Sequence, residues 1–102
     1  MSLKKQVLKS KPVCKVTFRV SKDIAAEAES VSLVGDFNNW DASVAPMNKL
    51  KSGEFTSIIE LEKGKSYEFR YLVNGKEWYN ETEADGFIAN SFGAENSVVQ
   101  AV

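Results

Sequence analysis

Trp40 ends a stretch whose residue types favour an exposed aromatic ring on a rigid turn. The run Val31–Val34 is typical of a buried strand, Gly35 permits a sharp bend, and Asn38-Asn39 tolerates left-handed turn conformations. Trp40 is therefore predicted at the tip of a loop and not inside a strand. Because a large exposed ring is costly unless it packs or binds a ligand, this loop is the first candidate for a functional site.

The second tryptophan, Trp78, also stands close to a turn. Tyr67–Val73 alternates between two faces, Asn74-Gly75 is a strong hairpin signal, and the returning strand begins near Lys76 and carries Trp78. A flat apolar ring can cover the C–H face of a pyranose while nearby polar groups bond its hydroxyls. Both tryptophans are thus candidates for sugar binding, with the alternative that each caps the end of the hydrophobic core.

The remaining segments predict the scaffold. Val13–Val20 alternates apolar and polar residues as a half-buried strand does, and 21–30 predicts a loop that crosses from one sheet to the other. The segment 80–94 predicts a long surface loop. That loop is expected to be held by Phe87, Ile88 and Phe92. About seven short strands separated by turns indicate an all-β fold, a two-sheet antiparallel sandwich. Its predicted core includes Val16, Phe18, Leu33, Phe69, Tyr71 and Val98.

Length and charge exclude several classes of function. With 102 residues the chain predicts one domain, divided into an N-terminal extension over 1–12 and a single module over 13–102. Thirteen basic and fourteen acidic residues give a formal charge of −1, which predicts no nucleic acid and no membrane as partner. No apolar run has the length of a signal peptide or a membrane span, so a cytoplasmic protein is expected.

The residue types that catalysis and metal binding need are scarce. The chain has no histidine, and its single cysteine, Cys14, lies in an apolar strand pattern that predicts core packing. Asp36 and Asp41 flank the Trp40 turn, but glycoside hydrolysis needs two carboxylates at a fixed separation in a deep cleft. We therefore predict no catalytic residues, no metal and no cofactor, and hence no enzyme activity.

The hexapeptide Gly35-Asp36-Phe37-Asn38-Asn39-Trp40 resembles a signature of the glycogen-binding and isoamylase N-terminal type of carbohydrate-binding module. This early-set, family 48-like module is also the type found in the β subunit of the AMP-activated protein kinase. The resemblance extends over Val31–Val99. Its further pieces, in order, are Pro46-Met47, Tyr67–Val73, Asn74-Gly75 followed by Trp78, Phe92-Gly93, and Asn96-Ser97-Val98-Val99. The resemblance implies an immunoglobulin-like β-sandwich.

The resemblance also implies which residues bind sugar. Trp40 and Trp78 align with the aromatic platform of the family, and Arg70 aligns with a basic residue, more often lysine, that bonds sugar hydroxyls. Asn96 aligns with an asparagine that contacts sugar, and Phe92 with an apolar residue that wedges against the glycan.

The other three residues, like the two tryptophans, have structural alternatives. Arg70 can form an exposed ion pair with Glu68 or Glu54 instead of binding sugar. Asn96 can serve a turn at the entry of the last strand, and Phe92 can fill a position in the core, which is the interpretation we favour for it.

The function that the resemblance implies is a non-catalytic module that stands alone and binds an α-glucan, glycogen-like or starch-like, or a maltooligosaccharide. Glycan-processing enzymes that carry such a module append it to a much larger catalytic domain, for which 102 residues leave no room. The alternative is an interaction domain that keeps the sandwich, has lost sugar binding, and associates with a separate glycan enzyme or a kinase-type complex. The sequence predicts no oligomeric state.

Overall fold

Strands make up nearly all of the regular structure. The computed structural model describes residues 2–7, 10, 12–21, 28–41, 43, 46–91 and 93–101, and the statements below concern these residues. The elements in chain order are β1 (Ser2–Val7), β2 (Val13–Val20), β3 (Val31–Gly35), the 3-10 turn η1 (Asp36–Asn38), β4 (Asn48–Lys49), β5 (Phe55–Glu62), β6 (Lys65–Val73), β7 (Glu77–Tyr79), β8 (Gly86–Ala89) and β9 (Glu95–Ala101).

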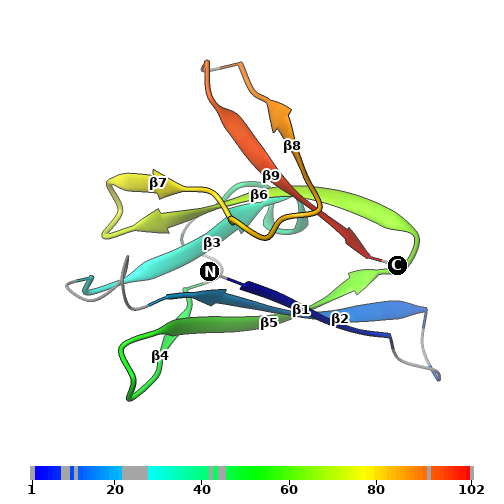
Figure 1. Ribbon diagram of the computed structural model, residues 1–102, viewed down its shortest axis with the longest axis horizontal. Helices are drawn as coiled ribbons and strands as arrows, with labels where there is room; N and C mark the ends of the chain where they lie inside the picture. The colour runs from blue at the N-terminus through cyan, green and yellow to red at the C-terminus, as the bar shows by residue number, and fades with distance from the viewer. Residues whose placement is uncertain are drawn as a thin grey trace.

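Two antiparallel sheets pack face to face (Figure 1). The first sheet has the order β1-β2-β5-β4, and the second has the order β3-β6-β9-β8, with β7 also paired to β6. The chain passes from the first sheet to the second between β2 and β3, as predicted, although residues 22–27 of that connection lie outside the described residues. The prediction of an all-β, immunoglobulin-like antiparallel sandwich is confirmed.

The described part of the chain contains nine strands, where the sequence predicts about seven. The sequence does not predict β1 because a charged residue interrupts the alternation of apolar and polar residues. Lys5 pairs with the buried Val16 and therefore occupies an inward position. The strands β4 and β8, with two and four residues, are too short to show a period.

The core lies where the inward side chains of the two sheets meet. Phe18 from β2 packs edge-to-face on Phe69 from β6, with ring centroids 5.0 Å apart. Five of the six predicted core residues and Cys14 belong to this cluster: Cys14, Val16, Phe18, Leu33, Phe69 and Tyr71. The sixth, Val98, is also buried, but it pairs with Glu68 on the outer face and therefore lies outside the cluster.

A carboxyl group is buried at one end of the core. Glu81 is fully buried, and its carboxylate accepts hydrogen bonds from the hydroxyl of Tyr71 (2.7 Å) and the backbone N–H of Glu83 (2.9 Å). The backbone N–H of Glu81 in turn donates to the hydroxyl of Ser97 at 2.8 Å. Burial and the neighbouring carboxylate raise the pKa of Tyr71 above its ordinary value, so its hydroxyl keeps its proton and remains a donor.

The predicted N-terminal extension, residues 1–12, contributes β1, which pairs with β2 along its whole length. Lys5 in this strand donates from Nζ to Oδ2 of Asp85 at 2.6 Å, and the same oxygen accepts the backbone N–H of Gln100 at 2.7 Å. This contact joins the first sheet to the second. The division of the chain at residue 13 stays a prediction, but the segment before it has a defined place in the sandwich.

Acid is expected to destabilise the protein through Asp85. Partial burial raises the pKa of this carboxyl, but the N–H of Gln100 and the ammonium of Lys5 lower it by more, so the pKa lies below its ordinary value. A pKa that is lower in the folded state than in the unfolded state stabilises the protein at pH values above the unfolded-state pKa of about 4. This contribution is lost as the pH falls through the folded-state pKa.

Urea unfolding of the parent protein and of Asp85→Asn at neutral pH and at about pH 3 measures this contribution. The parent should exceed the variant in free energy of unfolding at neutral pH, and the difference should shrink in acid. A difference that is the same at both pH values would contradict the assignment.

The segment 80–94, predicted as a long surface loop, contains β8, which pairs with β9 at the edge of the second sheet. The prediction that Phe87 and Ile88 hold this segment is wrong, because each residue is 48% exposed and the segment is held by the pairing of β8 with β9. Since successive strand residues point to opposite faces, the two side chains lie on different faces of β8. The third residue of that prediction, Phe92, lies outside the described residues.

Candidate functional site

The outer face of β6 carries the candidate site. Because strand side chains alternate, Arg70 points away from the core while its two neighbours point into it. Trp78 on β7 pairs with Leu72 of β6, and paired residues of antiparallel strands share a face, so Trp78 points outward as well. The predicted hairpin at Asn74-Gly75 joins these strands, with φ angles of 53° and 68° that suit a tight type I′ turn.

Trp40 reaches the same face from the loop that follows β3. Its backbone N–H donates to the carbonyl of Gly35 at 2.9 Å, while Asn38 accepts the N–H of Gly35 at 3.0 Å and donates to the carbonyl of Leu33 at 2.8 Å. Asn39 and Trp40 both have left-handed backbone conformations, with φ of 56° and 58°. That conformation is uncommon for a residue as large as tryptophan, so these hydrogen bonds must hold it.

Asp36 fixes the indole ring of Trp40. One carboxylate oxygen of Asp36 accepts the indole N–H of Trp40 at 2.9 Å, and the other accepts the backbone N–H of Glu68 in β6 at 2.8 Å. The carboxylate therefore links the loop to the central strand of the site.

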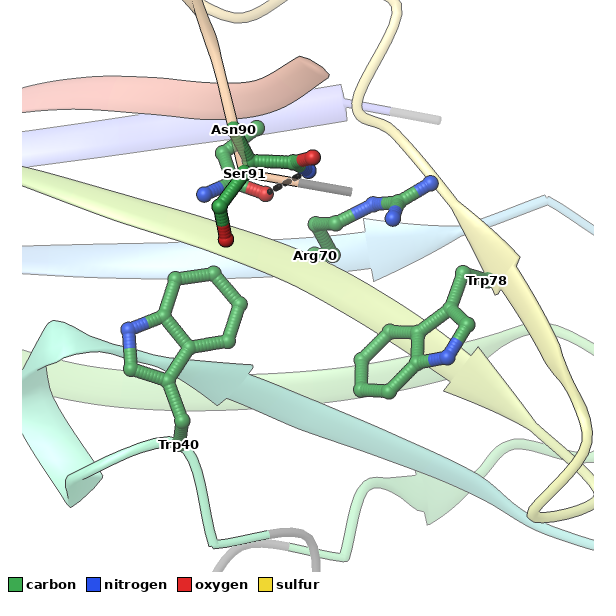
Figure 2. A pocket seen from close by; sticks show the side chains of 6 residues that line it. Trp40, Arg70, Trp78, Asn90 and Ser91 are labelled. Atoms are coloured by element: carbon green, nitrogen blue, oxygen red, sulfur yellow. Dashed lines mark hydrogen bonds between the residues drawn. The ribbon is translucent and has the colours of Figure 1, made fainter. Parts of the chain in front are cut away.

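The two indoles lie across an open hollow of about 480 Å³. Figure 2 shows their six-membered rings turned toward each other, with Arg70 placed between them. The hollow is lined by Trp40, Arg70, Trp78, Asn90, Ser91 and Asn96. Trp40 is 37% exposed and Trp78 is 44% exposed. The alternative that each tryptophan caps the end of the hydrophobic core therefore does not hold.

The guanidinium of Arg70 stacks over the ring of Trp78, with 5.6 Å between Cζ and the ring centroid. Neither predicted ion pair of Arg70 forms. Oε1 of Glu54 lies 3.9 Å from a guanidinium nitrogen of Arg19. Within the described ranges no carboxylate lies at ion-pair distance from Arg70. The Nε of Arg70 is buried and has no hydrogen-bond partner among those residues. Most buried N–H groups in proteins have a hydrogen-bond partner, so this donor is an exception within the described residues.

Asn96 belongs to a series of side-chain hydrogen bonds at the rim of the hollow. Its Nδ2 donates to Oε1 of Glu68 at 3.2 Å, and its Oδ1 accepts from Nδ2 of Asn90 at 3.0 Å, the bond drawn in Figure 2. Asn90 is held in turn by Ala94. The backbone N–H of Asn90 donates to the carbonyl of Ala94 at 2.9 Å, and Oδ1 of Asn90 accepts the backbone N–H of Ala94 at 3.2 Å. The amide of Asn96 therefore has a fixed orientation.

The structure brings together four of the five predicted site residues: Trp40, Arg70, Trp78 and Asn96. The fifth, Phe92, lies outside the described residues. Asn90 and Ser91 also line the hollow, and the sequence analysis missed them. Their position directly after β8, in the polar stretch that leads to Asn96, is the signal that points to them.

The polar groups of the hollow are amides, a hydroxyl and a guanidinium, which suit hydrogen bonding to a neutral polar ligand. Across the described residues, no group of three or more histidine, cysteine, aspartate or glutamate side chains is arranged to hold a metal ion. Within the same residues, no helix has the length and apolarity needed to cross a membrane.

Asp36→Ala is expected to loosen the Trp40 loop. The variant loses the bonds to the indole N–H and to the N–H of Glu68, which should cost about 1 to 2 kcal/mol of unfolding free energy and raise the quenching of Trp40 fluorescence by acrylamide. Asp41→Ala is the matched control, because it removes the same charge one residue beyond the ring while its described hydrogen bonds go to Ser43. Equal quenching in the two variants would contradict the role of Asp36.

An antiparallel sandwich that presents two exposed indoles, a guanidinium and two amides around one hollow defines a small β-sandwich binding module. The chain matches the family model of carbohydrate-binding module 48, the isoamylase N-terminal domain, over residues 10–87. The protein belongs to this family, as the hexapeptide around Gly35–Trp40 and the spaced motifs after it predict.

Two similar proteins are much longer enzymes. The chain is 31% identical over 90 residues to the 1,4-alpha-glucan branching enzyme GlgB of Pseudoalteromonas atlantica, a match that covers 86% of this chain and 12% of the enzyme. It is 35% identical over 71 residues to the GlgB of Mycobacterium ulcerans, covering 70% of this chain and 9% of the enzyme. The chain therefore spans about a tenth of the length of these relatives.

Proposed function

We propose that this chain is a non-catalytic module that binds α-glucans of the glycogen or starch type, or maltooligosaccharides. The observation that carries the proposal is the pair of exposed indoles, Trp40 and Trp78, on either side of one hollow. Each ring can cover the C–H face of a glucose unit, while Arg70 and Asn96 offer N–H donors to its hydroxyls. Phe92 remains a proposed contact from the family resemblance alone.

The choice of an α-1,4-linked glucan is supported by the relatives. The similar enzymes are named for branching 1,4-alpha-glucan, and the matches to them cover 86% and 70% of this chain. An open site with two rings and a few solvent-exposed hydrogen bonds should bind weakly, with a dissociation constant of roughly 10 μM to 1 mM, or about 4 to 7 kcal/mol.

The non-catalytic part of the proposal is supported by the carboxylates near the rings. Both oxygens of Asp36 accept hydrogen bonds from Trp40 and Glu68, and Asp41 accepts two from Ser43. These hydrogen bonds use both carboxylates to hold the loop, whereas glycoside hydrolysis needs two carboxylates that face each other in a deep cleft. Incubation with glycogen should release no reducing ends above a buffer control, and turnover that Asp36→Ala abolishes would contradict this part.

Native affinity gels that contain glycogen, amylopectin or cellulose test the binding proposal. The protein should migrate more slowly in the glycogen and amylopectin gels than in a gel without polysaccharide, and normally in the cellulose gel. Normal migration in all three gels would contradict the proposal and favour the alternative, an interaction domain that has lost sugar binding. Retardation by cellulose alone would contradict the assignment to α-glucans.

A further inference from the structure

The edge strand β8 carries an exposed isoleucine beside the hollow. Ile88 is 48% exposed and pairs in register with Asn96, which lines the hollow. Paired residues of antiparallel strands point to the same face, with Cα atoms about 5 Å apart. Ile88 therefore continues the face of the hollow by one strand toward the edge of the second sheet.

The neighbouring Phe87 lies on the other face. It is also 48% exposed, but it pairs with Ser97, which is fully buried on the inner side of β9. The two apolar side chains thus have the same exposure and the same strand, yet the register directs only Ile88 toward the face of the candidate site.

The chain runs directly from Ile88 into the wall of the hollow. Two residues after it comes Asn90, whose side chain bonds Asn96 at 3.0 Å, and then Ser91, which also lines the hollow. An occupant of the hollow that extends toward β8 passes these polar groups and then meets the aliphatic side chain. This continuity favours the end of a long ligand over a separate partner as the occupant of the Ile88 surface.

We infer that Ile88 forms an outer apolar subsite for an α-glucan chain that is longer than the hollow accommodates. The inference rests on the proposed function. The aliphatic side chain covers the C–H face of a further glucose unit and removes apolar surface of both partners from water. Affinity should therefore rise with the number of glucose units in the ligand. The gain from units that bind beyond Asn96 should depend on Ile88.

Calorimetric titration of the parent protein, Ile88→Ser and Phe87→Ser with maltooligosaccharides from maltotriose to maltoheptaose tests the subsite. Ile88→Ser should weaken maltoheptaose binding about fivefold and maltotriose binding less than about twofold. Phe87→Ser, the matched control on the opposite face, should change neither by more than about twofold. Ile88→Thr keeps the β-branched shape and replaces Ile88→Ser if the serine variant does not fold.

The outcomes separate the subsite from the proposed function. If the parent binds maltoheptaose and Ile88→Ser binds it equally well, the subsite is refuted while α-glucan binding stands. Equal losses in Ile88→Ser and Phe87→Ser would also refute it, because exposure and not register would then decide the effect. A folded parent that binds no saccharide of the series would refute the proposed function and the subsite with it.

Discussion

Trp40→Ala and Trp78→Ala should each weaken α-glucan binding at least about tenfold, a loss near 1.4 kcal/mol. Truncation removes the ring that stacks on the sugar and keeps water away from the neighbouring hydroxyl contacts. Trp78→Ala should have the larger effect, because Arg70 stacks over this ring at 5.6 Å and loses its support. Titration of both variants with maltoheptaose measures the loss.

The same variants should remain folded. Both rings lie on an outer sheet face and are 37% and 44% exposed, whereas truncating a tryptophan in a core costs about 3 to 5 kcal/mol of stability. Ile58→Ala is a suitable control, since Ile58 is 56% exposed on β5 of the other sheet and should affect neither melting nor binding. Variants of Trp40 and Trp78 that melt far below the parent would contradict the assignment of these rings as platforms.

Gly35→Ala is expected to cause the largest loss of stability. A Cβ atom at this position would lie 2.5 Å from the carbonyl oxygen of Glu68 and 2.8 Å from Cβ of Phe69. Because one of these atoms belongs to the backbone of β6, relief requires that β3 move away from β6, at a cost of about 3 kcal/mol. For a domain of this size the loss corresponds to roughly 10 to 20 °C in melting temperature.

Thermal melts of Gly35→Ala and of the control variant Gly86→Ala test this expectation. A Cβ at Gly86 meets no atom within 4 Å, so that variant should melt within a few degrees of the parent, about 1 kcal/mol or less. The backbone at Gly35 is extended, with φ of −175°, so close approach and not an unusual conformation accounts for the expected effect. Equal melting temperatures for the two variants would refute this explanation.

The sequence is most informative where a local pattern decides the structure. The alternation of Tyr67–Val73 predicts β6 and correctly directs Arg70 outward. Asn74-Gly75 predicts the hairpin that places Trp78, and the Gly35–Trp40 signature predicts both the exposed turn and the family. Each of these signals lies within about ten residues of chain, so no tertiary information is needed to recognise it.

Features that depend on contacts between distant segments could not be predicted. Lys5 occupies an inward position in β1 because its ammonium donates a hydrogen bond to the carboxylate of Asp85, eighty residues later in the chain. Glu81 is buried because Tyr71 and the backbone of Glu83 satisfy its carboxylate. Nothing in the local sequence distinguishes these charges from those on the surface.

The same reason explains the parts of the candidate site that were missed. Asp36 was singled out as an acidic flank of the turn, but its two partners, the indole of Trp40 and the N–H of Glu68, become evident only when β3 lies beside β6. Asn90 becomes part of the hollow because the pairing of β8 with β9 sets it against Asn96. Register between strands, which sequence specifies only indirectly, decides both positions.

The indole N–H signals provide the most direct test of the account. The protein has two tryptophans, so its ¹H–¹⁵N spectrum contains two such signals, and the one from Trp40 belongs to a proton bonded to Asp36. During titration with maltoheptaose, we predict that both indole signals and the Nε–H signal of Arg70 shift together, with one dissociation constant of roughly 10 μM to 1 mM. A folded protein whose indole signals both stay in place up to about 10 mM saccharide would contradict the account.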